Sequence, residues 1–249
     1  MLRAMPDHLP FLFGVFLLAG FVKGVTGLGL PTVGVGLLSL VMPPAVAASF
    51  IVVPSLVTNL WQMVGGGALV PLLRRLWPMQ AGIVGGTAAG AMLLGSGGSG
   101  AVLALGLALL GYAAIGLSPW ALPRVPGGIE AWGGPLAGGA TGVVSAATGV
   151  FVIPAVPYLQ GLGLGREALV QALGLSFTTA TVALGVALML TGSLGGGVAA
   201  GSLLALGPAL AGLWIGQRVR RAVRPEVFRR CFFAGLLALG AHLVLRGLW

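Results

Sequence analysis

The chain has 249 residues, of which 57% are hydrophobic and only 7% charged, with a net charge of +9 and a single cysteine. Soluble domains normally contain about 25% charged residues, so this composition excludes a soluble enzyme, a nucleic-acid-binding module and a protein with one membrane anchor. At about 20 apolar residues per crossing helix, the chain is long enough for about eight crossings, and one cysteine excludes internal disulfides and cysteine-rich metal sites.

Apolar runs bounded by charge, proline and glycine predict ten hydrophobic segments. In chain order they cover residues 9–22, 30–42, 44–64, 76–94, 99–117, 131–144, 150–160, 167–191, 197–216 and 231–248. Six of them hold 18 to 25 residues, so each is long enough to cross a bilayer alone. The other four are short and form two adjacent pairs, and each pair is separated by a break rich in glycine and threonine. Such breaks expose backbone polar groups, which a membrane tolerates only where they are buried in protein or line a wet cavity.

The two breaks resemble each other. The first reads Gly20-Phe21-Val22-Lys23-Gly24-Val25-Thr26-Gly27-Leu28-Gly29-Leu30-Pro31, and the second reads Gly142-Val143-Val144-Ser145-Ala146-Ala147-Thr148-Gly149-Val150-Phe151-Val152-Ile153-Pro154. The first glycine and the Thr-Gly pair match at one offset of 122 residues, and the proline matches after one inserted residue. Together with the matched flanking segments, this pattern predicts an internal duplication.

Charge placement predicts that the two halves lie antiparallel. Each half has five elements, an odd number, so the second half begins on the opposite side of the membrane from the first. Arg74 and Arg75 follow the third element of the first half, whereas 191–197 has no charge; 95–99 has none, whereas 217–230 carries six arginines. By the positive-inside rule this indicates two inverted repeats, 1–118 and 131–249, joined by a cytoplasmic linker over 119–130. The predicted fold is an all-α polytopic membrane protein in which each repeat starts with a broken or re-entrant helix pair.

Lys23 is the only charged residue inside an apolar segment or its break. A buried ammonium costs at least about 2.5 kcal/mol on insertion scales, which makes an intramembrane lysine a candidate functional residue. The alternative is that the side chain extends to a nearby membrane surface. Ser145 holds the corresponding place in the second half, so the predicted site is symmetric in shape but not in charge.

The breaks have the composition of an anion site. Glycines allow a tight turn that brings backbone N–H groups close to a ligand, here Gly24, Gly27, Gly29 and Gly149. Half-helices that begin near Leu30 and Val150 direct their positive ends at the same volume, and Thr26 and Thr148 add hydroxyl donors. The competing interpretation is close helix packing through small residues.

Asn59 and Ser176 are polar residues in the middle of matching long segments, and they complete the candidate substrate site. Interhelical hydrogen bonding explains them equally well. The four acids lie at segment ends or in loops, so no carboxylate relay and no cation site is expected inside the membrane. The sequence contains no motif of an enzyme, and we expect no catalytic residue, no cofactor and no metal.

At these motifs the chain resembles the sulfite exporter TauE/SafE family of bacterial membrane permeases. The resemblance rests on Gly20 to Gly29 followed by Pro31, on Thr58-Asn59-Leu60-Trp61-Gln62, and more weakly on Gly142 to Pro154. The family implies a duplicated helical transporter that moves small sulfur-containing oxyanions or organosulfonates outward across the cytoplasmic membrane. It also implies a substrate site where the two Thr-Gly breaks meet.

These observations together predict a secondary transporter of a small anion, with alternating access around a midplane site and no nucleic-acid partner. Its predicted location is the cytoplasmic membrane of a bacterium. A small-anion channel is the first alternative, and it requires a continuous pore. A membrane-embedded accessory subunit that transports nothing is the second. The oligomeric state is open.

Overall fold

The computed structural model describes residues 5–94, 99–119, 123–193, 196–220, 222 and 224–248. In this part of the chain, 85% of the residues are helical. The helices are α1 (Met5–Thr26), α2 (Leu30–Leu38), α3 (Pro44–Val64), α4 (Leu69–Leu94), α5 (Ser99–Leu117), α6 (Gly127–Thr148), α7 (Ala155–Gly161), α8 (Arg166–Leu190), α9 (Gly196–Val219) and α10 (Pro225–Leu248). The predicted all-α class is therefore confirmed.

Four helices in the described ranges are long and apolar enough to cross a membrane: α3, most of α5, α8 and most of α10. Helices α4 and α9 have 26 and 24 residues, and both are longer than the segments 76–94 and 197–216 expected for them. The first members of the two short pairs differ from expectation. Both α1 and α6 have 22 residues, because each continues through polar and glycine-containing turns that hydropathy alone treats as boundaries. Only α2 and α7 are short, with 9 and 7 residues.

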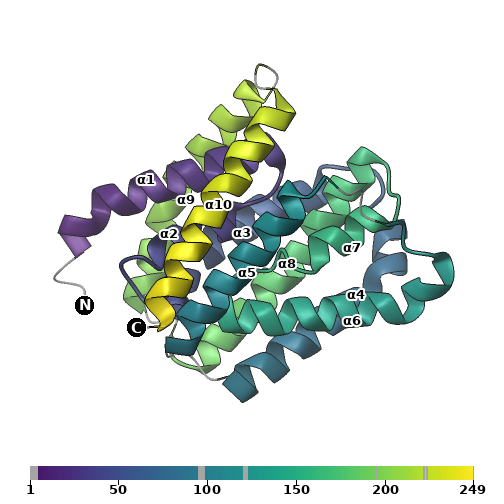
Figure 1. The fold of residues 1–249 in the computed structure, drawn as a ribbon, viewed down its shortest axis with the longest axis horizontal. Coiled ribbons are helices and arrows are strands. Elements are labelled where there is room, and N and C mark those ends of the chain that lie inside the picture. Colours follow the sequence, from purple (N-terminus) through teal and green to yellow (C-terminus); the bar gives the residue numbers. More distant parts are fainter. Residues whose placement is uncertain are drawn as a thin grey trace.

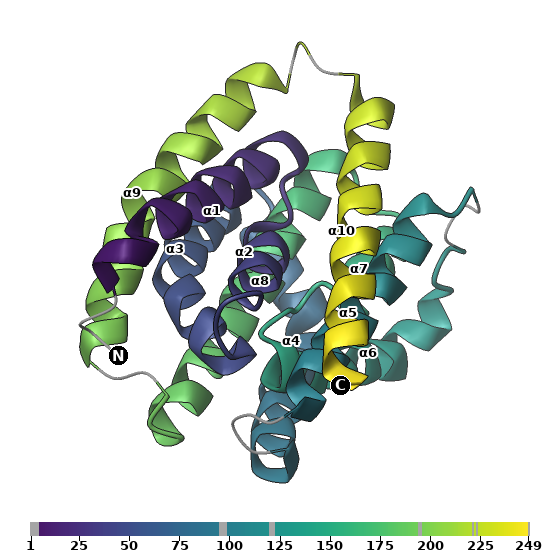
Figure 2. The ribbon, with the colours of Figure 1, turned by 60° about the vertical axis from the view of Figure 1, so that its left-hand side comes forward.

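The order of helix lengths and packing partners repeats along the chain (Figures 1 and 2). Helix α1 packs along α9, and α6 packs along α4, so the first helix of each half lies against the fourth helix of the other. Helices α3 and α8 pack together in the interior, and α5 packs along α10. An internal duplication predicts this exchange of partners. The antiparallel orientation of the halves in the membrane stays a prediction. Three parts of its charge argument lie outside the described residues, namely 95–98, 194–195 and Arg221.

Glycines allow the two exchanged helix pairs to approach closely. A Cβ atom at Gly20 would lie 2.1 Å from the carbonyl oxygen of Ala209, and one at Gly142 would lie 2.3 Å from that of Ile83. Small residues at such contacts are the usual means by which membrane helices pack. The α4–α6 pair also carries an ion pair near its ends, in which the guanidinium of Arg75 donates to both carboxylate oxygens of Glu130 at 2.9 and 2.5 Å.

Arg74 and Arg75 lie within the first turns of α4, because α4 begins at Leu69 and not near residue 76 as expected. The connection between α3 and α4 is therefore short and consists of residues 65–68. This short connection lies beside the N-terminus of α8, where the largest of the cavities described below is found.

Candidate functional site

The first break ends α1 with a threonine and a glycine. The hydroxyl of Thr26 donates to the carbonyl of Val22 at 2.9 Å and accepts from the N–H of Leu28 at 3.0 Å. The N–H of Gly27 donates to the carbonyl of Lys23 at 2.7 Å, and Gly27 has a φ of 80°. This left-handed residue closes the last helical turn in the manner of a glycine C-cap. The motif therefore fixes Lys23 in the final turn of α1.

The second break repeats this geometry. The hydroxyl of Thr148 donates to the carbonyl of Val144 at 2.6 Å and accepts from the N–H of Val150 at 3.1 Å. Gly149 has a φ of 73°, and its N–H donates to the carbonyl of Ser145 at 2.7 Å. Lys23 and Ser145 thus hold equivalent positions, as the sequence comparison predicts.

Two details of the expected anion site differ from the structure. The hydroxyls of Thr26 and Thr148 are engaged by backbone groups of their own breaks, because a threonine at a helix end satisfies nearby backbone groups before it meets a ligand. Helix α2 begins at Leu30 as expected, but α7 begins at Ala155 and not near Val150. The second break is therefore longer than the first, and it is followed by a helix of only two turns.

Lys23 is 3% exposed, and its ammonium contacts two neutral side chains of α3. The Nζ atom donates to the hydroxyl of Thr58 at 3.0 Å and to Oδ1 of Asn59. The amide of Asn59 in turn donates to the hydroxyl of Thr181 on α8 at 3.2 Å. Within the described residues, the ion pair in the structure is that of Arg75 with Glu130, so no described carboxylate compensates the charge of Lys23.

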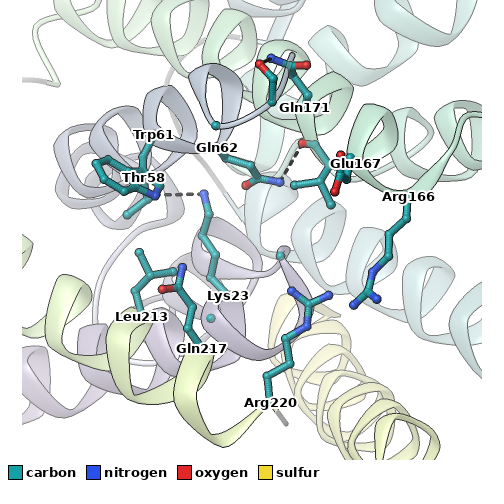
Figure 3. A pocket seen from close by; sticks show the side chains of 15 residues that line it. Lys23, Thr58, Trp61, Gln62, Arg166, Glu167, Gln171, Leu213, Gln217 and Arg220 are labelled. Carbon is teal, nitrogen blue, oxygen red and sulfur yellow. Dashed lines mark hydrogen bonds between the residues drawn. The ribbon is translucent and has the colours of Figure 1, made fainter. Parts of the chain in front are cut away.

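Lys23 lines a cavity of about 430 Å³, which we name the lysine cavity (Figure 3). Four helix ends and the α3–α4 connection form it: the C-terminal turns of α1, α3 and α9, and the N-terminal turn of α8. Its walls include Gly24 and Gly27 from the first break and Trp61 and Gln62 from α3. This end of the helix bundle, where α3 ends and α8 begins, is called the basic end below.

The charged side chains of the lysine cavity give it a net positive charge. Arg166 of α8 and Arg220, which follows α9, line it together with Lys23, while Glu167 supplies a single carboxylate. Figure 3 shows the guanidinium groups of the two arginines turned toward each other at one side of the cavity. Both arginines are exposed. A cleft with one predominant sign of charge attracts ligands of the opposite sign.

Two glutamines hold the α3–α4 connection against α8. Gln171 is 1% exposed; its Oε1 accepts from the N–H of Ala68 at 2.9 Å, and its amide donates to the carbonyls of Met63 and Gly66 at 2.7 and 2.9 Å. The amide of Gln62 donates to the carbonyl of Val170 at 3.1 Å. The bonds of Gln171 to Ala68 and Gly66 satisfy backbone groups of the connection. Together with the bond of Gln62 to α8, they fix the wall of the lysine cavity opposite Lys23.

A second, smaller cavity of about 30 Å³ lies against the other break. Thr148 and Gly149 line it, together with alanines from α3, α4 and α6 and the C-terminal part of α8. We name it the alanine cavity. It is found where α3 begins and α8 ends, so it lies at the opposite end of these two helices from the lysine cavity.

The ten predicted substrate residues are therefore divided. The structure brings together Lys23, Gly24 and Gly27 in the lysine cavity, with Asn59 bonded to Lys23. Thr148 and Gly149 line the other cavity. The remaining four line neither, and they are Thr26, Gly29, Ser145 and Ser176.

Two of these four residues, Ser145 and Ser176, have buried hydroxyl groups. The hydroxyl of Ser176 accepts from the amide of Gln80 at 3.1 Å. That of Ser145 is buried without a hydrogen-bond partner. Gly29 has a φ of 103°, and a Cβ atom there would lie 2.9 Å from a methyl of Val22. The contacts of Ser176 and Gly29 are between neighbouring segments, as in the packing alternative that the sequence leaves open.

Several lining residues are absent from the predicted site. Arg220 is interpreted from the sequence only as one of the arginines that indicate topology, Trp61 only as part of the family motif, and Gln217 of α9 receives no role. Gln217 and Arg220 reach the cavity because α9 packs along α1, with its C-terminal turn beside Lys23. A contact between segments about 190 residues apart leaves no local signal in one sequence. The only hint is the cluster of polar residues that ends a long apolar segment.

Comparison with known proteins agrees with the resemblance found in the motifs. Searches of curated proteins and of solved structures returned no match. The family model described as Sulfite exporter TauE/SafE matches residues 12–243 of the 249-residue chain. This match covers both breaks and every helix that lines the lysine cavity. The chain therefore belongs to the sulfite exporter TauE/SafE family of membrane transporters.

Proposed function

We propose that the protein exports a small anion, a sulfur-containing oxyanion such as sulfite or a short organosulfonate, and that the lysine cavity binds it. The membrane is the cytoplasmic membrane of a bacterium. Lys23 is the central ligand, and the cavity alternates between the two sides of the membrane as the repeats 1–118 and 131–249 rock against each other. The family supports transport, and the contacts around Lys23 support an anion as the substrate.

The single observation that carries the proposal is a buried ammonium with neutral partners only. An uncompensated charge is costly inside a membrane protein, and the ammonium has three N–H donors. Thr58 and Asn59 accept two of them. The third donor and the net charge are left for a ligand, because Lys23 also lines the open cavity. An anion bound there supplies the missing counter-charge.

The cavity's size and charge agree with this class of ligand. A water molecule occupies about 30 Å³ in the liquid, so a cavity of about 430 Å³ holds roughly a dozen waters, or a small sulfonate together with part of its hydration shell. Arg166 and Arg220 attract the anion to the basic end, and Gln62 and Gln217 offer further amide donors. With the basic end in the cytoplasm, as the positive-inside rule predicts, the cavity takes its anion from the cytoplasm.

A carrier fits the cavities better than a channel. The lysine cavity and the alanine cavity have no lining residue in common, whereas a channel requires a continuous pore. Export needs no additional driving ion in this scheme. An inside-negative membrane potential expels an anion with about 2.3 kcal/mol per charge for each 100 mV.

Flux into proteoliposomes tests the function directly. Purified protein is reconstituted, and uptake of labelled sulfite, sulfate and short sulfonates is measured for the wild type and for Lys23→Met, which keeps the side-chain length and removes the charge. Loss of a charged hydrogen-bond donor is worth about 1.5 to 3 kcal/mol, so flux should fall about tenfold or more. Exposed Arg229, which does not line the cavity, gives the matched control Arg229→Met, for which flux should be unchanged.

The outcomes separate the alternatives. Saturable flux that supports counterflow identifies a carrier, whereas single-channel currents identify a channel. Absence of flux for every anion in the wild type contradicts the transporter proposal and leaves the accessory subunit. Flux that is unchanged in Lys23→Met removes the proposed site but not the transport function.

A further inference from the structure

The alanine cavity corresponds to the lysine cavity position by position. Under the shift that relates the two breaks, Gly24 matches Ala146 and Gly27 matches Gly149, in each case 122 residues apart. All four residues line their respective cavities. The N-terminal break thus forms one wall of the large cavity, and the C-terminal break forms the equivalent wall of the small one.

The same correspondence holds for the walls contributed by the long helices. Trp61 of α3 matches Leu184 of α8 at a shift of 123, and Gln171 of α8 matches Ala48 of α3 at the same shift. Each member of these two pairs lines its own cavity. Because α3 and α8 exchange roles, the two cavities lie at opposite ends of the same helix pair.

A short chain of hydrogen bonds leads from Lys23 on α1 to residues of α3 and α8. It runs from Lys23 to Asn59 and from Asn59 to Thr181. Thr58, which also accepts from Lys23, matches Thr181 at the shift of 123. Of the two equivalent threonines, Thr58 therefore accepts from Lys23 and Thr181 accepts from Asn59.

At the alanine cavity, Gly149 packs directly against side chains of α2 and α3. A Cβ atom at Gly149 would lie 2.7 Å from the Cβ of Ala48 and 3.3 Å from a methyl of Val35. Among the described residues, no charged side chain lines this cavity, and its walls are alanine, leucine, threonine and glycine. It differs from the lysine cavity both in its volume, about 30 against about 430 Å³, and in the absence of a group that retains an anion.

We propose that the alanine cavity is the release vestibule of the same transport path, collapsed in this conformation, and that it receives the anion from Lys23 across Asn59 and Thr181. This inference rests on the proposed transport of a small anion. Because equivalent segments of the two halves line the two cavities, the alanine cavity expands when the lysine cavity closes. A vestibule without a cation does not hold the anion once it has left Lys23. The pathway therefore has a binding end and a releasing end.

Thiol accessibility tests this assignment. The exposed Cys231 is first replaced by serine. One reporter cysteine is then placed at Ala187, which lines the alanine cavity, and the matched reporter at Gln217, which lines the lysine cavity. Proteoliposomes receive a membrane-impermeant methanethiosulfonate reagent on either side. Sulfate and methanesulfonate serve as the transported anions, because sulfite itself attacks the reagent.

We expect the two reporters to react from opposite sides of the membrane. An anion gradient that drives cycling should raise the labelling rate of Ala187→Cys at least about threefold and change that of Gln217→Cys in the opposite sense. Labelling of both from the same side, or an inert Ala187→Cys in vesicles that transport sulfate, overturns the release vestibule and leaves the proposed function standing. Wild-type vesicles without any flux overturn both.

A bulky substitution gives a second readout. Ala187→Trp fills the collapsed vestibule and should abolish flux while the anion still stabilises the protein thermally through Lys23. The control is Val186→Trp on the neighbouring, 50% exposed position of α8, for which flux should persist. Full flux in Ala187→Trp contradicts the proposal.

Discussion

The break after Lys23 and the break after Ser145 end their helices with the same set of hydrogen bonds, yet they line cavities of different size and chemistry. The first lines a cavity with a lysine, two arginines, one glutamate and three glutamines, whereas the second lines a cavity with alanines and leucines. The comparison teaches that the Thr-Gly motif ends a helix in the same way at both places. The difference between the two cavities comes from the side chains that other helices place around the motif.

The largest expected effect comes from giving the second break the charge of the first. Ser145→Lys puts an ammonium at a fully buried position, where the hydroxyl of Ser145 has no hydrogen-bond partner among the described residues. An uncompensated charge there costs at least about 2.5 to 3.5 kcal/mol, so we expect little folded protein by size-exclusion chromatography in detergent. Ser145→Ala is the control and should fold normally. A stable, active Ser145→Lys protein would show that the two regions are interchangeable.

The second prediction gives Lys23 a permanent counter-ion. Asn59→Asp keeps the shape of the side chain that accepts from Lys23, but it supplies a carboxylate that competes with the anion. Electrostatic pairing of this kind strongly favours the charged lysine. The apparent affinity for the anion, measured from the anion-dependent rise in thermal stability, should therefore fall about tenfold, which corresponds to about 1.4 kcal/mol. Asn59→Gln serves as the neutral control. An undiminished anion response in Asn59→Asp contradicts the role of Lys23 as the anion's partner.

The third prediction concerns the helix pairs that support the two regions. Gly20→Ala and Gly142→Ala each force a methyl group against a carbonyl oxygen of the partner helix, at 2.1 and 2.3 Å respectively. Overpacking of this kind costs about 1 to 3 kcal/mol, and thermal unfolding in detergent should show similar losses for both. Gly85→Ala is the matched control on α4, because nothing lies within 4 Å of its Cβ position. Unequal losses at Gly20 and Gly142 would show that only one pair depends on close approach.

The fourth prediction removes the two threonine hydroxyls. Thr26→Val and Thr148→Val each break the bonds that close their own break. Each should lower the free energy of unfolding by about 1 kcal/mol, while the apparent affinity for the anion changes little. The affinity is measured by flux at several anion concentrations. A selective loss of affinity in Thr26→Val, with stability intact, would instead assign its hydroxyl to the substrate.

The smallest expected effect is at the mouth of the lysine cavity. Arg220→Gln removes one exposed cation that lines it. Exposed charges contribute about 0.2 to 1 kcal/mol and are screened by salt, so the apparent KM for flux should rise about threefold at low ionic strength and by less at high salt. Arg229→Gln is the control for general surface charge. A salt-independent effect would mean that Arg220 contacts the bound anion directly.

Much of the fold follows from the sequence because the bilayer restricts the choice of structure. Backbone groups must be satisfied inside each membrane segment, so long apolar runs form helices, and the boundaries of α3, α5 and α8 lie within one residue of those expected. The lengths of α1 and α6 are underestimated, because polar and glycine-containing turns continue a helix when neighbouring helices bury them. Hydropathy indicates which residues can face lipid, but it does not show which polar residues are buried by neighbouring helices.

The sequence by itself determined three things about this protein: that it is helical and membrane-embedded, that it contains two equivalent breaks, and that Lys23 is the unusual charge. Each depends on composition or on local pattern. Tertiary structure decided which residues surround that charge. Asn59 and Thr58 reach Lys23 because α9 packs against both α1 and α3, and Gln217 of α9 and Arg220, which follows it, line the same cavity. Those contacts depend on helix packing across most of the chain, which no single stretch of sequence encodes.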